Sequence, residues 1–299
     1  MNLTKNDTIA IVAPAGFIKD KKAVEQAILM LKNWGFQVVL GKHLYKKHKH
    51  FAGTDLQRTE DFQGFLDNPN IKAIWCARGG YGSIRIIDKL DFTIFKKHPK
   101  FIIGYSDICI FHQVVFNLDV PSVHGFMPTS LETIQTAKQA VSNFYNILTG
   151  SKTNYKIPVN KSNKNGKATG KIIGGNLSIL QSLTGTKFGL KNKKYILFIE
   201  EIAEYKYHID RMLHSLKLNG YFDNCVALLV GSFTKIPVND PLFGESIEEI
   251  ILNVVKEYNF PVCFDFPSGH IVNNQPILFG KEAVLEITDN SVTLEYLEN

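Results

Sequence analysis

The sequence predicts an α/β protein whose first half forms a parallel sheet with helices on both faces and whose second half forms a β-rich α/β domain. Three observations support this prediction. Short apolar runs alternate with amphipathic stretches in the first half, a polar segment follows, and β-type runs dominate the remainder. The chain has 299 residues, of which 44% are hydrophobic and 21% charged, so it has the composition and length of two ordinary globular domains.

Strands and helices are expected to alternate along the first half. This order indicates βαβ units and a parallel sheet, in which ligands collect at the carboxyl ends of the strands. The expected strands cover residues 8–14, 36–41, 71–77, 101–107 and 121–125, and the expected helices cover 21–35, 55–68, 83–90 and 110–116.

Residues 151–167 are rich in lysine and asparagine and have almost no hydrophobic rhythm, which is typical of a connection. We therefore expect an N-terminal domain over 1–150, a linker over 151–167 and a C-terminal domain over 168–299. The second domain has expected strands at 171–175, 195–201, 224–233, 261–266 and 283–298, and expected helices at 176–183, 208–220 and 246–258.

The charge pattern does not indicate a nucleic-acid-binding protein. The formal charge is +6, and lysines are densest at 41–50 and 161–167, where no aromatic residues interleave in a nucleic-acid-reading pattern. Histidines 43, 48 and 50 lie among these lysines, which predicts a surface position for them. We expect no nucleic-acid partner.

Cysteine usage and hydropathy indicate a soluble protein of the cytoplasm. The four cysteines, Cys76, Cys109, Cys225 and Cys263, occur singly in apolar segments, which predicts buried thiols in a reducing compartment with neither a disulfide framework nor a zinc site. The N-terminus lacks the layout of a secretory signal, and no apolar stretch reaches the ~18 residues that span a bilayer. We expect a cytoplasmic location and no membrane partner.

The stretch FIIGYSD at 101–107 ends an apolar strand in Gly-Tyr-Ser-Asp just before an expected helix. A serine on a sharp turn between strand and helix exposes its hydroxyl at the edge of the sheet, close to helix N–H groups. This pattern makes Ser106 a candidate nucleophile. The alternative is that Ser106 or Asp107 only caps the helix, and the local pattern favours the cap because GYSD is not the GxSxG elbow.

A serine nucleophile needs a base, and the base needs an orienting acid. Among the nine histidines, His270 stands at the end of the apolar run PVCFDFPSGH; its alternative is a loop histidine bonded to backbone. Glu200 and Glu201 end the apolar run YILFIEE, where a buried acid requires a partner. That partner is either a catalytic histidine or a structural arginine such as Arg211.

A glycine-rich turn, CARGGYGS at 76–83, follows another expected strand. Adjacent glycines such as Gly79 and Gly80 leave backbone N–H groups unobstructed, which suits an oxyanion hole or an anion cradle. The turn lacks the lysine and spacing of a P-loop. An ordinary glycine turn without function is the alternative.

Taken together, these motifs resemble the LD-carboxypeptidase family, serine peptidases that include the microcin C immunity proteins. The resemblance runs over almost the whole chain and rests on motif order: IAIVAPAG, ARGGYG, GYSD, HG at 124–125, GGN at 174–176, LFIEE, HIDRML and SGH. It implies an N-terminal flavodoxin-like domain, a C-terminal β-rich domain, often a dimer, and no cofactor or metal.

The resemblance also implies a triad of Ser106, Glu200 and His270, with the nucleophile on the first domain and the other two residues on the second. Backbone N–H groups of Asp107 and Gly80 would then receive the oxyanion. The implied substrate is a cytoplasmic murein tetrapeptide that loses its terminal D-alanine during cell-wall recycling.

Arg78, which precedes the two glycines, is our candidate for binding the free terminal carboxylate of such a peptide. An exopeptidase must recognise the end of the peptide, and the free carboxylate is the charged group that distinguishes this end. The alternative role for Arg78 is a salt bridge to a neighbouring acid.

The chain departs from the family pattern at two places. Family members often have Glu-Asp where this chain has Glu200-Glu201, which leaves open which glutamate orients His270, and Phe126 stands where a proline is common after HG. Two other functions remain: a microcin-immunity-like amidase acting on an aminoacyl nucleotide, and a non-catalytic two-domain binding protein. The first would need an aromatic loop, whereas 151–167 offers only Tyr155.

Overall fold

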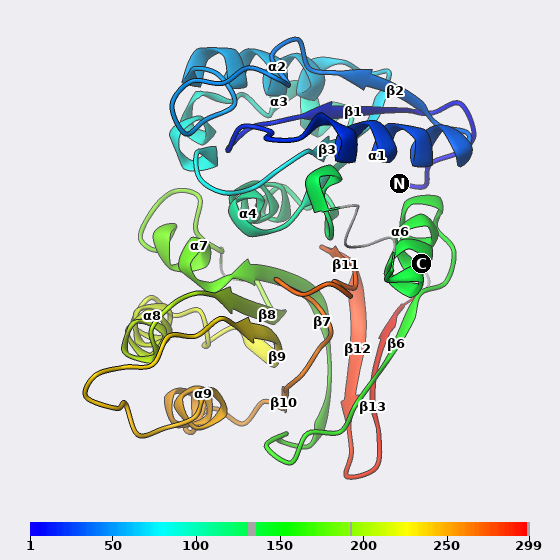
Figure 1. Ribbon diagram of the computed structural model, residues 1–299. Helices are drawn as coiled ribbons and strands as arrows, with labels where there is room; N and C mark the ends of the chain where they lie inside the picture. Colours follow the sequence, from blue (N-terminus) through cyan, green and yellow to red (C-terminus); the bar gives the residue numbers. More distant parts are fainter. Residues whose placement is uncertain (131–135, 192, 298–299) are drawn as a thin grey trace. The chain divides into compact units, whose positions relative to one another are not determined.

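The structure, a computed structural model, describes residues 1–130, 136–191 and 193–297 and divides into two compact units (Figure 1). Unit 1 comprises Met1–Ser151 and Val272–Leu278, and unit 2 comprises Lys152–Ile271 and Phe279–Asn299. A short segment near the C-terminus thus returns to the N-terminal unit, which the expected domain limits did not include.

The described part of unit 1 contains a six-stranded sheet in the order β11-β5-β4-β3-β1-β2. Its pairs β1–β2, β1–β3, β3–β4 and β4–β5 are parallel. The order of β2, β1, β3, β4 and β5 is that of flavodoxin-like sheets, so the predicted fold class is confirmed. The strands are β1 (Thr8–Val12), β2 (Gln37–Leu40), β3 (Ile71–Cys76), β4 (Phe101–Gly104), β5 (Ser122–His124) and β11 (Ile277–Phe279).

Helices cover both faces of this sheet, as Figure 1 shows for α1 and α2. Ile9 and Ile11 of β1 share one apolar cluster with Val24 and Leu31 of α1, whereas Ala10, which is also fully buried, lies outside that cluster. This alternation follows from the strand period of two. The helices of unit 1 are α1 (Lys21–Asn33), α2 (Asp55–Asp67), α3 (Thr93–Lys97), α4 (Cys109–Asn117) and α6 (Lys138–Thr149), with 3₁₀ turns η1 (Ser83–Arg85), η2 (Ile87–Lys89), η3 (Ser106–Ile108) and η4 (Pro128–Ser130).

The described part of unit 2 contains a seven-stranded mixed sheet in the order β10-β9-β8-β7-β12-β13-β6. The strands from β7 to β10 are parallel, and β12, β13 and β6 extend the sheet by antiparallel pairing. The elements are β6 (Asn154–Ile157), β7 (Gly166–Asn176), α7 (Leu177–Ser182), β8 (Tyr195–Ile202), α8 (Lys206–Leu218), β9 (Cys225–Thr234), α9 (Ile247–Val255), β10 (Val262–Cys263), β12 (Glu282–Ile287) and β13 (Val292–Tyr296).

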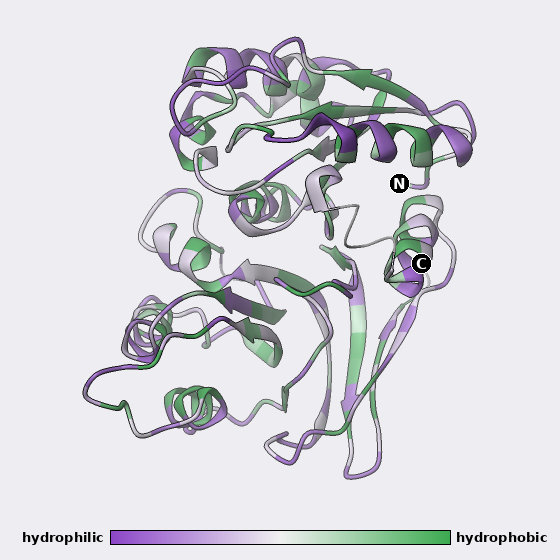
Figure 2. Cartoon of the chain, in the orientation of Figure 1, coloured by the Kyte–Doolittle hydropathy of each residue, from purple (hydrophilic) through white to green (hydrophobic). Residues whose placement is uncertain are grey.

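Several expected elements differ from the structure. The expected strand at 283–298 is the antiparallel pair β12 and β13, and the one at 261–266 is reduced to β10. The expected linker at 151–167 contains β6, in which Tyr155 and Ile157 are buried, because two alternating apolar residues suffice for a strand at the edge of a sheet. The expected helix at 83–90 is instead the two 3₁₀ turns η1 and η2. Figure 2 shows the hydrophobic residues along β1 and β2, two of the strands that apolar runs predicted.

The environments of the cysteines and of His43 test two predictions made from the sequence. All four cysteines are free and buried, as predicted. The surface position expected for His43 is wrong: the ring is buried and its Nδ1 lies 2.9 Å from Asp61 of α2. Within residues 1–130, 136–191 and 193–297, every helix is too short or too polar to cross a bilayer.

Lys100, immediately before β4, is almost completely buried. Its ammonium donates hydrogen bonds to the backbone oxygens of Phe65, Leu66 and Asn68 at 2.9, 2.8 and 2.7 Å. These carbonyls belong to the C-terminal end of α2 and the residue after it, where helix carbonyls lack helical partners. Lys100 therefore satisfies the end of α2, while burial lowers the pKa of its ammonium to about 8.

Replacing Lys100 with methionine should lower the free energy of unfolding by about 3 kcal/mol, because three carbonyls lose a charged donor. Urea denaturation would measure the change. Lys97→Met removes an exposed cation from α3 and serves as the matched control, with an expected change below about 0.5 kcal/mol. Equal effects of the two substitutions would contradict this role for Lys100.

Candidate active site

Ser106 lies at a sharp turn between β4 and α4. Its φ of 62° is in the left-handed region, which is uncommon for a residue with a side chain and is often retained at functional sites. Neither η3 nor α4 has a side-chain hydrogen bond at its N-cap. The hydroxyl of Ser106 therefore does not cap a helix, which was the alternative considered from the sequence.

His112 of α4 supports this turn from inside unit 1. Its Nε2 lies 2.9 Å from the carbonyl oxygen of Gly104 and its Nδ1 lies 2.8 Å from the hydroxyl of Ser122. Burial lowers the pKa of His112 to about 4, so the ring is neutral near pH 7. Because a carbonyl only accepts, Nε2 carries the proton and Nδ1 accepts from Ser122. His112 thus fixes the strand end that precedes Ser106.

The glycine turn after β3 packs directly against Ser106. A Cβ at Gly79 would lie 3.1 Å from the Cβ of Ser106 and 3.4 Å from the backbone nitrogen of Asp107. The carbonyl of Gly79 accepts a hydrogen bond of 3.0 Å from Gly16. Since the carbonyl and the N–H of a trans peptide point in opposite directions, this bond also orients the N–H of Gly80.

Asp107 joins the serine turn to the far end of the glycine turn. Its buried carboxylate accepts a 2.8 Å hydrogen bond from the backbone N–H of Ser83. Burial raises the pKa of Asp107, and hydrogen bonding to Ser83 and the charge of Arg58 oppose that shift. The side chain of Asp107 therefore holds the two turns together, a role that the sequence analysis did not predict.

Arg78 is half-buried at the start of the glycine turn. Its Nη1 donates to the carbonyl of Phe17 at 2.6 Å, and its guanidinium lies 5.8 Å from the centre of the Phe17 ring. Among the described residues, Arg78 forms no ion pair with a carboxylate. The salt bridge considered as its alternative role is thus not found there, and the remaining N–H donors of Arg78 are left for another acceptor.

In unit 2, Glu200 and His270 form a close pair. Glu200, at the end of β8, is fully buried, and its Oε2 lies 2.7 Å from Nδ1 of His270. An ionised carboxylate only accepts, so Nδ1 carries the proton and Nε2 has the lone pair of a base. Gly269 has a φ of 122°, and a Cβ there would lie 2.9 Å from Oε2 of Glu200, so only glycine brings the histidine this close.

Glu201 has a different set of contacts, because successive side chains of a strand point to opposite faces. Its oxygens accept hydrogen bonds from Asn176, from the backbone and hydroxyl of Ser178, and from its own neighbour Ile202, all at 2.7 to 2.8 Å. Burial raises the pKa of Glu201, and these bonds oppose the shift. Glu200, not Glu201, therefore contacts His270, which answers the question that the sequence left open.

The structure thus brings the candidate residues together in two sets. Unit 1 gathers Ser106, Asp107 and the turn that begins at Arg78, and unit 2 pairs Glu200 with His270. Sequence reasoning missed Asn176, which caps α7 and binds Glu201, although the GGN motif marked its position. It also missed the buried Arg58, for which no local pattern gave a signal.

Comparisons with known proteins identify the family of the chain. A family model for the LD-carboxypeptidase N-terminal domain matches residues 9–125, and one for the C-terminal domain matches 169–285. The chain is 32% identical to the probable murein peptide carboxypeptidase of Bacillus subtilis (strain 168), over 98% of this chain and 93% of that protein.

Solved structures show the same fold. The chain is similar to the muramoyltetrapeptide carboxypeptidase of Oxalobacter formigenes, with a TM-score of 0.86, 28% identity, and coverage of 97% of this chain and 99% of that chain. It is also similar to the microcin C7 self-immunity protein MccF, with a TM-score of 0.85, 22% identity and coverage of 99% and 98%. At that identity, the second similarity concerns the fold alone.

The two neighbouring glutamates should respond differently to substitution by glutamine. Glu201→Gln should lower the free energy of unfolding by about 2 to 3 kcal/mol, because an amide nitrogen cannot accept from Ser178 or Ile202. Glu200→Gln retains an acceptor for His270 and should cost less than about 1 kcal/mol. Chemical denaturation of both variants tests this contrast, and a larger loss for Glu200→Gln would refute it.

Proposed function

This chain belongs to the LD-carboxypeptidase family, and we propose that it is a serine peptidase that hydrolyses the amide bond to the terminal D-alanine of murein tetrapeptides. The observation that carries the proposal is the left-handed turn at Ser106, whose hydroxyl caps neither following helix and lies against Gly79. The names of the similar carboxypeptidases support the choice of substrate.

In the proposed mechanism, Ser106, Glu200 and His270 act as a triad. Nε2 of His270 takes the proton from the Ser106 hydroxyl as Oγ attacks the carbonyl carbon of the scissile amide, and Glu200 stabilises the imidazolium that forms. Backbone N–H groups of Asp107 and Gly80 bind the oxyanion. The imidazolium then protonates the departing amine of D-alanine, and water hydrolyses the acyl-enzyme by the same steps in reverse.

Unit 2 supplies an observation that favours this function over an amidase for aminoacyl nucleotides. Tyr155, the aromatic residue of segment 151–167, is buried in β6 and packs edge-on against Phe266 and Tyr296, with ring centres 5.3 and 6.4 Å away. Its ring face is therefore not offered to a base. We further propose that the protein acts in the cytoplasm during murein recycling, as a homodimer, without a metal or cofactor.

Ser106→Ala and His270→Ala should each reduce the release of D-alanine by about 10⁴ to 10⁶ while the protein stays folded, because triad members act as a unit. Glu200→Gln should cost less than either. Incubation with murein tetrapeptide followed by mass spectrometry measures the loss of one alanine, and circular dichroism controls for folding. A fluorophosphonate probe should label wild type at Ser106; an unlabelled protein would indicate a non-catalytic binding protein.

Arg78 should recognise the terminal carboxylate, because its guanidinium has donors left for another acceptor. A charge-assisted bond contributes about 1.5 to 3 kcal/mol, so amidating the terminal D-alanine should lower kcat/KM about 10- to 150-fold in wild type. In Arg78→Ala, cleavage of the acid should slow by a similar factor while the amide is barely affected. If wild type cleaves both substrates equally fast, carboxylate recognition does not select the substrate.

A further inference from the structure

Arg58 of α2 is a buried cation that lies outside the proposed triad. It is almost completely inaccessible to solvent, although arginine is rarely buried without partners. Its Nη1 donates to the backbone oxygens of Pro14 and Gly82, the latter at 2.8 Å, and its Nη2 donates to Asp55. Two of its three acceptors are backbone carbonyls of loops, so the side chain of Arg58 fixes the positions of these two loops.

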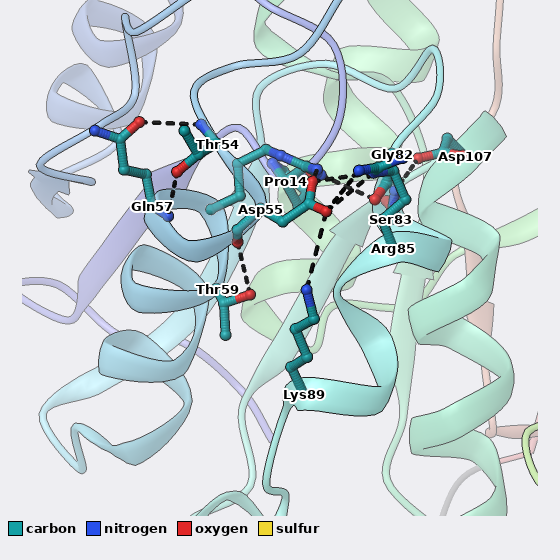
Figure 3. A network of polar contacts seen from close by, with 11 residues as sticks. Pro14, Thr54, Asp55, Gln57, Thr59, Gly82, Ser83, Arg85, Lys89 and Asp107 are labelled. Carbon is teal, nitrogen blue, oxygen red and sulfur yellow. Dashed lines mark hydrogen bonds and ion pairs between the residues drawn. The ribbon is translucent and has the colours of Figure 1, made fainter. Parts of the chain in front are cut away.

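The two loops follow neighbouring strands of the sheet. Pro14 lies two residues after the end of β1, and Gly82 lies in the glycine turn after β3, which pairs with β1. One guanidinium therefore bridges the carboxyl ends of two adjacent strands. Figure 3 shows Pro14, Gly82 and Asp55 gathered in this network, with Asp107 at its other end.

The peptide unit that joins Gly82 to Ser83 is held from both sides. Arg58 binds the carbonyl of Gly82, and Asp107 binds the N–H of Ser83. A Cβ at Gly82 would lie 2.7 Å from Nη1 of Arg58, and φ at this residue is 143°, so the contact requires glycine. The turn is thus clamped between a cation and the carboxylate that follows Ser106 in the chain.

The guanidinium of Arg58 is also connected to Gly79, at the start of the glycine turn, through the loop that follows β1. Pro14, which Arg58 binds, is two residues before Gly16, and Gly16 donates to the carbonyl of Gly79. Gly79 in turn packs on Ser106. Arg58 is therefore linked to both ends of the glycine turn. It binds Gly82 directly, and it is connected to Gly79, which precedes Gly80, through the loop from Pro14 to Gly16.

Asp55 holds the outer side of the guanidinium. It binds Arg58 and also Arg85 of η1, whose Nε lies 3.0 Å from each carboxylate oxygen, and these contacts lower the pKa of Asp55. Asp55 is itself placed by the start of α2, where Thr54 and Gln57 form a capping box. The charge of Arg58 is thus paired and its orientation fixed.

We propose that Arg58 is a positioning residue for the oxyanion site: it fixes the glycine turn against Ser106 so that the N–H of Gly80 points at the developing negative charge. This inference rests on the proposed function. It assigns Arg58 no contact with substrate. Its effect should therefore appear in kcat, because a displacement of about 1 Å in catalytic groups costs about 100-fold in rate, while ground-state binding changes little.

The test compares Arg58→Met with Lys100→Met in the full-length protein. Both substitutions remove a buried cation that holds backbone carbonyls next to α2, but Lys100 lies at the helix end away from the glycine turn. Both variants should lose thermal stability. At a temperature where both are folded, Arg58→Met should lower kcat for murein tetrapeptide about 100-fold with KM within about threefold, whereas Lys100→Met should keep both near wild type.

If kcat of Arg58→Met falls no further than that of Lys100→Met, Arg58 is a structural residue only and the proposal is wrong. If wild type itself releases no D-alanine, the proposed function fails, and that outcome is distinct because it does not depend on Arg58.

Should Arg58→Met not fold, a milder pair of variants replaces it. Asp55→Asn removes the charge on the outer side of the guanidinium, and Asp61→Asn, also on α2, removes the charge next to His43 instead. About a tenfold loss of kcat in Asp55→Asn, without a matching loss in Asp61→Asn, would support the proposal. Equal kcat values in these two variants would overturn it.

Discussion

The packing of Gly79 against Ser106 is the constraint on which the candidate site in unit 1 depends. A side chain at position 79 would meet the Cβ of Ser106 at 3.1 Å, so the two turns approach as closely as backbone allows. Such proximity is maintained only if both turns are fixed from behind. His112 holds the strand end before Ser106, and Asp107 holds the glycine turn from the serine side. Without these supports, a left-handed serine would relax toward ordinary backbone geometry.

In unit 2, two adjacent carboxylates of β8 are buried, and each has its own hydrogen-bond partners. The pleat of β8 sends Glu200 and Glu201 to opposite faces, so each finds its own environment. Glu201 is surrounded by donors from the start of α7, which makes it part of the fold. Among the hydrogen bonds of the described residues, the one to the carboxylate of Glu200 comes from the ring of His270. One strand end thus supplies both a structural and a candidate catalytic acid.

The sequence predicted those parts of the site that lie at strand ends, because the order of strands and helices is periodic and parallel strands end at the same edge. This pattern made Ser106, His270 and the pair Glu200 and Glu201 candidates, and the family resemblance then selected Ser106, Glu200 and His270. Arg58 could not be predicted, since its partners are backbone carbonyls of loops 44 and 24 residues away. Nor could β11, whose three residues are too few to show a period and whose pairing with β5 joins distant parts of the chain. Local sequence patterns predict helices and strands, whereas the contacts of Arg58 and the pairing of β11 form only when the whole sheet has assembled.

The contrast between the buried charges indicates why Glu200 suits a catalytic role. Within the described residues, Oε1 of Glu200 has no hydrogen-bond partner, although the residue is fully buried. Lys100 and Glu201, in comparison, each have two or more hydrogen-bond partners. A buried carboxylate with few donors is poorly solvated, so it gains most when a positive charge forms next to it. If His270 accepts a proton from Ser106, that positive charge appears 2.7 Å from Glu200. In the proposed mechanism, this poorly solvated carboxylate would favour the transfer of a proton from Ser106 to His270.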